Sequence, residues 1–242
     1  MAFARLVQAE TLDYLAEDDP RAIRSRADLR RIHAVMGTRR ILLKALRRMR
    51  IKPRRVLELG AGDASLTLRL ARALADEWGA VHLTLLDRQN AVTSRTLQSF
   101  ERLGWTVESV NTDVLDWIRE PSQQTFDLAL ANLFLHHFEE SELSALLRAL
   151  SLRARALCAC EPRRTRLALA GSRLVGMLGA NAVTREDAVL SVQAGFVGSE
   201  MSQLCKPALP GWQIEEYPAG LFTQCLAAVR PTDRRMNDAD RI

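Results

Sequence analysis

The sequence predicts one α/β domain, built on a doubly wound, mostly parallel sheet of seven strands with an N-terminal helical cap. From residue 54 onward, short apolar runs typical of strands alternate with segments whose leucines recur every three to four residues. This alternation is the pattern of βαβ units, which place helices on both faces of a parallel sheet. The chain has 242 residues and is 48% hydrophobic, which is enough for one large core.

Two helices are expected ahead of the first strand. Asp19 and Pro20 form a helix start, because proline suits the first helical position. Apolar spacing predicts one helix over 20–36 and a second over 38–50. Residues 1–52 form the predicted cap.

In the predicted core, residues 53–230, strands are expected to alternate with helices. Strands are expected at 54–60, 81–87, 106–113, 126–133, 155–161, 211–217 and 221–229, and helices at 64–78, 91–103, 139–152, 163–180 and 184–194. Thr184 and Asp187 have the spacing of a capping box at the start of the last helix. The tail 231–242 has no apolar periodicity, so we expect it to be frayed.

Positive charge is concentrated in one block. Residues 21–55 hold 14 Lys and Arg and one acid, whereas the rest of the chain holds 20 bases and 28 acids. Three interpretations are open: a solvated amphipathic cap, a cap that closes over the cofactor and an anionic or lipid-like substrate, or a surface that grips RNA phosphates. No Phe, Tyr or Trp lies between residues 15 and 77, which weakens the RNA interpretation because base stacking needs aromatic rings.

The sequence also favours a cytoplasmic protein. The N-terminal segment has Glu10 where a secretory leader needs an apolar region. The longest candidate membrane span, 167–184, carries Arg173 in its middle. The four cysteines, Cys158, Cys160, Cys205 and Cys225, show no disulfide framework. Cys158 and Cys160 lie one residue apart in an apolar run and would share one face of a strand, so we expect these two to be buried thiols and not part of a metal site.

The stretch VLELGAGDASL, residues 56–66, is expected to contain a ligand site. Gly60 and Gly62 come where the first core strand turns into a helix. Glycine lets the backbone turn tightly and lets a ligand lie against it, and ligands bind at the carboxyl ends of strands in such sheets. The third glycine of a dinucleotide fingerprint is missing, because Ser65 occupies that position.

Two carboxylates accompany this loop. Glu58 precedes the glycines and Asp87 ends the next strand. A carboxylate at the end of the second strand can accept hydrogen bonds from a ribose diol. Glu58 can hold an ammonium group or orient the loop. The pattern therefore predicts a site for a nucleoside with a cationic tail and no pyrophosphate.

At this point the sequence resembles the class I S-adenosylmethionine-dependent methyltransferases. ELGAGDA matches their glycine loop, with Ala64 in place of the third glycine, and LTLLDR, NTDVLDW and FDLALANLFLHHF match three later motifs in order. The resemblance covers residues 54–161 and implies S-adenosylmethionine as cofactor. The cofactor-binding residues that it implies are Glu58, Gly60, Ala61, Gly62, Asp87, Arg88, Asp113, Val114 and Asn132.

The implied reaction is displacement at a sulfonium methyl group, helped by positioning and by exclusion of water. If the acceptor is a phenol or an enol, a general base contributes further. His136 and His137 follow the fourth-strand motif and are candidates for that base, although either one can simply pack or cap a helix. Glu161, at the end of the fifth strand, is the other candidate; an ion pair with Arg163 or Arg164 is its alternative role.

The segments DLRRIHAVMGTRR, NLFLHHF and TREDAVLSVQAGF carry a finer resemblance, to the ubiquinone/menaquinone and polyketide-modifying methyltransferases. That resemblance suggests a small hydrophobic acceptor methylated at oxygen or activated carbon. The segment 167–178 is apolar and helical, and we expect it to line a pocket for that acceptor. Two alternatives remain open: an RNA methyltransferase that uses the basic block, and a non-catalytic binding protein on the same fold.

Overall fold

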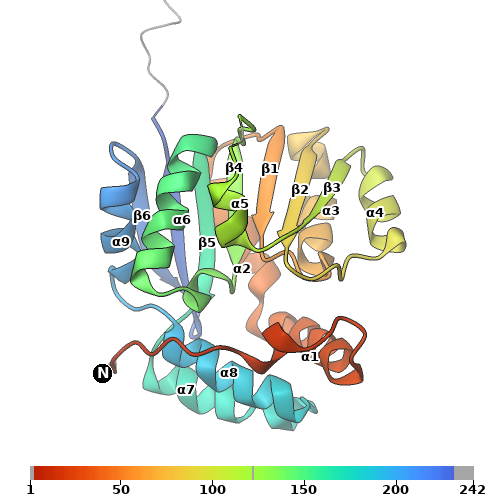
Figure 1. Ribbon diagram of the computed structural model, residues 1–242, viewed down its shortest axis with the longest axis vertical. Coiled ribbons are helices and arrows are strands. Elements are labelled where there is room, and N and C mark those ends of the chain that lie inside the picture. The colour runs from red at the N-terminus through yellow and green to blue at the C-terminus, as the bar shows by residue number, and fades with distance from the viewer. Residues whose placement is uncertain (1–2, 122, 232–242) are drawn as a thin grey trace, which may run out of the picture.

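The computed structural model describes residues 3–121 and 123–231. A seven-stranded sheet in the order β3-β2-β1-β4-β5-β7-β6 forms its centre (Figure 1). The strands are β1 Arg55–Leu59, β2 His82–Asp87, β3 Thr106–Asn111, β4 Leu128–Asn132, β5 Ala156–Pro162, β6 Gln213–Ala219 and β7 Thr223–Val229. Pairing is parallel except that β7 runs antiparallel to both β5 and β6. The predicted fold class is confirmed.

Helices cover both faces of this sheet. One face packs against α5, α6 and α9, and the other packs against α2, α3 and α4. The helices are α1 Pro20–Met36, α2 Thr38–Met49, α3 Ser65–Trp78, α4 Ser94–Glu101, α5 Val114–Arg119, α6 Glu140–Arg153, α7 Arg166–Arg173, α8 Ala182–Ala194 and α9 Glu200–Ala208, with 3₁₀ turns η1 Thr11–Tyr14, η2 Leu135–His137 and η3 Val175–Leu178.

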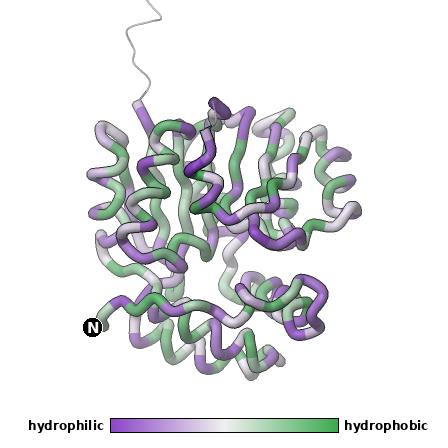
Figure 2. Tube along the Cα trace, viewed as in Figure 1, coloured by the Kyte–Doolittle hydropathy of each residue, from purple (hydrophilic) through white to green (hydrophobic). Residues whose placement is uncertain are grey.

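The alternation of side chains along β1 explains the two cores. Leu57 and Leu59 point into the core beneath α5 and α6, whereas Val56 belongs to the core beneath α2 and α3. All three are buried, as expected for a central parallel strand that is covered on both faces. Figure 2 shows that hydrophobic residues are frequent along the strands.

A cap of helices lies across one end of the sheet (Figure 1). It consists of α1, α7, α8 and the extended N-terminal segment, and α1 and α7 both contact α8. Helix α2 instead buries Leu42 and Leu46 in the core on one sheet face. The cap thus draws on residues from both halves of the chain, and the boundary at residue 52 stays a prediction.

Several element ends differ from expectation. Helix α8 begins at Ala182, because the side chain of Asn181 accepts a hydrogen bond from the Thr184 backbone N–H at 2.8 Å. The predicted capping box of Thr184 and Asp187 is therefore wrong. Helices α5 and α9, of 6 and 9 residues, were not predicted. The predicted frayed tail lies, from residue 232 onward, outside the described residues.

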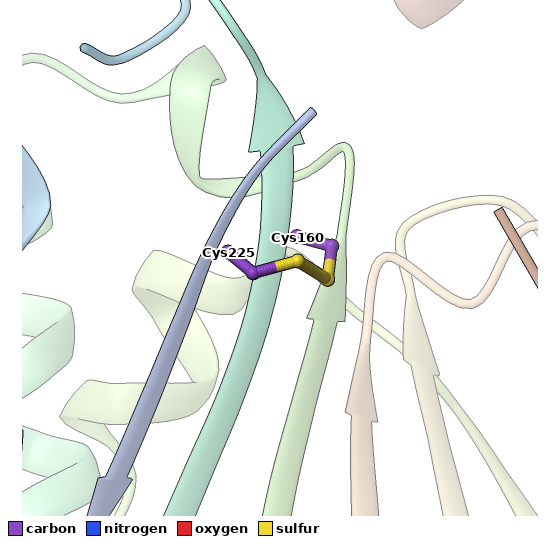
Figure 3. Close-up of a disulfide and its surroundings, with 2 residues drawn as sticks. All are labelled: Cys160 and Cys225. Atoms are coloured by element: carbon purple, nitrogen blue, oxygen red, sulfur yellow. A yellow bond between two sulfur atoms is a disulfide. The ribbon is translucent and has the colours of Figure 1, made fainter. Parts of the chain in front are cut away.

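The expectation of no disulfide is wrong, and so is the expectation of a buried thiol at Cys160. Cys160 on β5 and Cys225 on β7 form a disulfide (Figure 3). They are direct partners in the antiparallel register of these strands, although 65 residues separate them in sequence. Cys158 is a buried free thiol, as expected, and Cys205 is also free and buried.

No helix in the described ranges has both the length and the apolar character that a membrane crossing requires.

Candidate active site

A cavity of about 490 Å³ lies between the carboxyl ends of β1, β2 and β4 and the cap. Its wall combines the glycine loop after β1, the ends of β2 and β4, one face of α1, and the N-terminal segment. A volume of this size is typical of small-molecule sites. The sheet geometry explains the location, because parallel strands bring their loops together at one edge.

The glycine loop needs glycine at both positions. Gly60 has φ of 67°, and a Cβ there would collide with the ring of Phe134. Gly62 has φ of 54° with open space where a Cβ would stand, so its backbone faces the cavity. Both glycines therefore keep the loop tightly turned and free of side chains on the cavity side.

Ala64 occupies the third glycine position of the motif, and the backbone still adopts the conformation that favours glycine there. Its φ is 54° and its ψ is 14°. A left-handed conformation costs a non-glycine residue about 1–2 kcal/mol. Leu133, which follows β4 beside the cavity, has the same kind of strain with φ of 53°. Strained backbone of this kind is concentrated at functional sites.

Asp87 is fixed at the end of β2 by two backbone groups. Its Oδ2 accepts a hydrogen bond from Gly62 N–H and its Oδ1 accepts one from Gln89 N–H, each at 2.8 Å. Burial raises the pKa of this carboxyl. Asp87 also lines the cavity, so its side chain can contact both the glycine loop and a ligand bound in the cavity.

Asp113 and Val114 form the adjacent part of the wall. The Asp113 side chain caps α5 by accepting the Leu115 N–H at 2.7 Å. Val114 is 5% exposed. Ala61 also lines the cavity and is buried. The structure thus brings the predicted glycine-loop, second-strand and third-strand residues to one cavity.

Two buried acceptor oxygens in the wall have no partner among the described residues: Oε2 of Glu58 and Oδ1 of Asn132. Thr67 donates to the other carboxylate oxygen of Glu58. Burial, and the nearby charges of Asp87 and Asp63, raise the pKa of Glu58 to about 8. An unpaired buried acceptor is costly, so these two atoms suit a hydrogen-bond donor or a cation supplied by a ligand.

His136 is buried between two carboxylates. Its Nδ1 lies 2.7 Å from Oε2 of Glu161, and its Nε2 lies 3.4 Å from Oε1 of Glu10. Burial alone disfavours an imidazolium, but the hydrogen bonds with Glu10 and Glu161 outweigh it and raise the pKa of His136 to about 9. In the ligand-free structure this ring is therefore cationic at neutral pH, which does not favour a role as general base.

Glu161 lies behind the cavity wall rather than in it. Its Oε1 accepts the backbone N–H groups of Phe134 and Leu135 at 3.1 and 3.0 Å, and its Oε2 faces His136. The alternative ion pair with Arg163 or Arg164 is wrong: among the described residues Glu161 pairs with His136, and Arg164 pairs with Glu200. Glu161 thus fixes the turn that carries the histidines.

His137 is more accessible, with 21% of its side chain exposed. Its Nδ1 lies 3.3 Å from Oδ2 of Asp13. Arg88, expected at the cofactor, also pairs with Asp13, at 3.1 Å, and donates to the Asp13 backbone oxygen. Both contacts hold the N-terminal segment against the cavity.

We call residues 5–15 the strap, because they run along one wall of the cavity. Asp187 of α8 accepts the backbone N–H groups of Thr11 and Leu12 at 2.8 and 3.0 Å. Arg5 donates to backbone oxygens of Ala194 and Phe138 at 2.8 and 2.9 Å. The strap is therefore anchored to α8 and to the loop after β4.

Helix α1 contributes a face that the sequence analysis did not single out. Arg26, Leu29, Arg30 and His33 line the cavity, and their spacing of three and four residues is a signal available in the sequence. Arg30 pairs with Asp63 at 2.6 Å. Burial, and then the charge of Arg69, lower the pKa of His33 to about 4, so this ring is neutral at neutral pH.

The apolar segment 167–178 does not line the cavity, contrary to expectation. Leu167, Leu174 and Met177 are exposed instead. The apolar part of the wall comes from the strap, α1, α3, α5, the end of β2 and the turn after β4. It includes Val7, Leu12, Leu29, Leu66, Leu86, Val114, Leu115, Leu133, Phe134 and Phe138.

Residues 56–155 match the model of a family described as a methyltransferase domain. The chain carries a class I S-adenosylmethionine-dependent methyltransferase domain. The family resemblance predicted from the motifs is thereby confirmed. A search among curated proteins found no significant match to the methyltransferase.

Solved structures share the fold of this methyltransferase at low sequence identity. An O-methyltransferase family protein from Burkholderia thailandensis is 17% identical with a TM-score of 0.58, over 87% of this chain and 59% of its own. The plantazolicin methyltransferase BpumL, in complex with a monoazolic desmethylPZN analog and SAH, is 13% identical with a TM-score of 0.62, over 89% of this chain and 91% of its own. Human N-acetylserotonin methyltransferase, in complex with SAM, is 14% identical with a TM-score of 0.54, over 88% and 57%. The methyltransferase thus spans less than two thirds of the first and third of these proteins.

Proposed function

We propose that this methyltransferase transfers a methyl group from S-adenosylmethionine to an oxygen or an activated carbon of a hydrophobic small molecule. The observation that carries the proposal is the pair of unpartnered, buried oxygens, Oε2 of Glu58 and Oδ1 of Asn132, beside the bare glycine loop. The cofactor's ammonium group fits this pair, because it offers donors to Oδ1 of Asn132 and to the ionised form of Glu58, and its positive charge would lower the raised pKa of Glu58.

The other predicted cofactor residues follow from the same placement. Asp87 would accept the ribose hydroxyls, and Asp113 with Val114 would flank the adenine. Gly60, Ala61 and Gly62 would leave room for the cofactor against the backbone. When bound, S-adenosylmethionine supplies a sulfonium methyl: a bond forms between the acceptor atom and the methyl carbon, while the carbon–sulfur bond breaks and its electron pair stays on sulfur.

The acceptor side of the cavity is the part near the strap and the histidine pair. Its apolar wall suits a hydrophobic acceptor and excludes water, which strengthens polar interactions inside. Of the two histidines, His137 would accept the proton of the acceptor, and Glu161 would position both through the turn after β4. BpumL, whose complex contains an azole-bearing analog, supports a small-molecule acceptor by similarity of fold. The cytoplasmic location stays a prediction.

Calorimetry with S-adenosylhomocysteine tests the cofactor assignment. We expect micromolar or tighter binding, about −8 kcal/mol. Asp87→Ala removes a charged hydrogen-bond partner and should weaken binding by about 1–3 kcal/mol. Asp116→Ala is the matched control, because Asp116 is an exposed carboxylate paired with Arg119 on α5. Equal affinity in both variants would remove Asp87 from the site, and no binding by the unmodified protein would refute the proposed function.

A further inference from the structure

Three potential metal ligands meet at the acceptor side of the cavity. Glu10 of the strap and His136 and His137 of η2 each place one ligand atom within 4.8 Å of the other two. The Nε2 of His136 and Oε1 of Glu10 are 3.4 Å apart, and the two imidazole rings have centroids 4.3 Å apart. All three residues belong to the cavity wall.

Each histidine is held from behind by a carboxylate. Glu161 lies 2.7 Å from Nδ1 of His136, and Asp13 lies 3.3 Å from Nδ1 of His137. Metal-binding histidines typically donate one ring N–H to such a carboxylate, which fixes the ring and leaves the other nitrogen for the ion. In both rings the nitrogen left over is Nε2.

The charge around the cluster favours a cation. Three carboxylates, Glu10, Asp13 and Glu161, contact the two rings. Arg88 pairs with Asp13 at the edge of the cluster, and Arg5 donates to the backbone oxygens of His136 and Phe138. Neither nearby guanidinium pairs with Glu10 or Glu161. Glu10 faces Nε2 of His136 and accepts a hydrogen bond from the Ser191 hydroxyl, so a metal ion would take the place of the proton on Nε2 between the ring and this carboxylate.

We propose that Glu10, His136 and His137 bind a first-row divalent transition-metal ion. Two imidazole nitrogens and one carboxylate oxygen suit ions such as Zn²⁺ or Co²⁺. Ligand bonds of about 2.0–2.2 Å place tetrahedral ligands roughly 3.3–3.6 Å apart. The 3.4 Å between Oε1 of Glu10 and Nε2 of His136 lies within this range. The ligand atom of His137 lies within 4.8 Å of both and would approach them by side-chain rotation. The sequence predicted no metal site, because Glu10 is distant along the chain from the histidines.

This inference rests on the proposed function in one respect, the role of the ion. Three protein ligands leave coordination positions open on the cavity side. A hydroxyl oxygen bound there loses its proton to water more readily, because the cation stabilises the oxyanion. The site therefore selects acceptors with a phenolic or enolic oxygen.

The test uses the full chain, stripped with a chelator and titrated with Co²⁺ and, separately, Zn²⁺. Co²⁺ in such a site gives visible absorption, and Zn²⁺ binding is measured by calorimetry. We expect one ion per chain, and at least tenfold weaker binding in Glu10→Gln and in His137→Gln. His82→Gln is the control, because His82 is 41% exposed at the amino end of β2. His136→Gln is avoided as the main variant, because it leaves Glu161 buried without its partner; circular dichroism checks that the other variants fold.

Undetectable Co²⁺ and Zn²⁺ binding, or equal binding in the unmodified protein and in both cluster variants, would overturn the inference. S-adenosylhomocysteine affinity, measured on the same samples, separates the two proposals. Nucleoside binding without ion binding refutes the metal site and leaves the proposed function standing. Ion binding that depends on Glu10 and His137, in a protein that binds no nucleoside, supports the metal site and refutes the proposed function.

Discussion

Glu58 is a carboxyl group that the fold keeps from ionising easily. Its pKa is raised to about 8 by burial and by the nearby Asp87 and Asp63 charges. Between the usual pKa of a free glutamate, about 4.3, and pH 8, the folded chain therefore holds a proton that the unfolded chain has released. Protonated Glu58 therefore stabilises the fold at low pH, and this contribution to the free energy of unfolding is lost as pH rises toward 8.

We therefore expect the free energy of unfolding of the ligand-free protein to contain a term that falls with pH between about 4.5 and 8. Its slope is at most about 1.4 kcal/mol per pH unit. Glu58→Gln should remove this term, because the amide does not titrate. Denaturant unfolding across the pH range measures it, with the exposed Glu120→Gln as control. Parallel pH profiles for Glu58→Gln and the unmodified protein would contradict the raised pKa.

Sequence analysis found those site residues that sit in a local pattern. Gly60, Gly62 and Asp87 each follow a strand at a recognisable spacing, and the sheet brings them to the cavity. It missed Glu10 and Asp13, because their partners His136 and His137 are more than a hundred residues away. No periodicity connects positions that only tertiary packing brings together.

At the scale of elements, the strap depends on one buried carboxylate. Asp187 of α8 accepts the N–H groups of both Thr11 and Leu12. Asp187→Ala leaves these donors without their acceptor, at a cost of about 1–3 kcal/mol. We expect faster hydrogen exchange across residues 5–15 and a lower melting temperature.

The neighbouring Glu186→Ala serves as the matched control for the strap. Glu186 is exposed on the same helix, so its removal should leave exchange in the strap unchanged. If Asp187→Ala and Glu186→Ala exchange at the same rate in residues 5–15, the strap is held by its other contacts and not by Asp187.

Element length explains why the sequence predicted α1 and α3 but not α5. The 17 residues of α1 and the 14 of α3 give several turns of periodic spacing. The 6 residues of α5 give fewer than two turns, which is too short for a periodicity to stand out. The predicted capping box at Thr184 is wrong for another reason. It needs the Asp187 side chain to accept the Thr184 backbone N–H, and Asn181, three residues earlier, accepts that N–H instead.

At the scale of the whole molecule, much of the basic block holds parts of the structure together. Arg30 pairs with Asp63, Arg47 pairs with Glu77, and Arg48 lies over the ring of Tyr217. These contacts join α1 and α2 to the core. The concentrated charge thus has structural partners, although Arg40 and Lys44 of α2 stay exposed.

We accordingly expect no tight complex with structured RNA at 150 mM salt. If RNA binding depended on six phosphate contacts, the affinity would fall about 10³-fold when salt rises from 50 to 200 mM, because each contact releases a counterion. Titration of total cellular RNA at several salt concentrations, followed by a labelled-methyl transfer assay, measures both binding and activity. Stoichiometric methyl transfer into the RNA would overturn the small-molecule proposal.

The order of the seven strands and the disulfide also belong to this scale. The alternation of strands and helices predicts a parallel sheet, but the insertion of β7 between β5 and β6 is a matter of long-range packing. Cys160 and Cys225 meet only because of that insertion. The sequence separation of the two cysteines therefore does not predict the disulfide.

The strap sets a condition on the timing of a reaction cycle. It supplies Glu10 and Asp13 to the cavity wall, so the site is complete only while the strap lies against the cavity. Under the proposed function, binding and chemistry would then be separate events, divided by a displacement of residues 5–15. Release of the used nucleoside would require the protein to take apart one wall of its own active site.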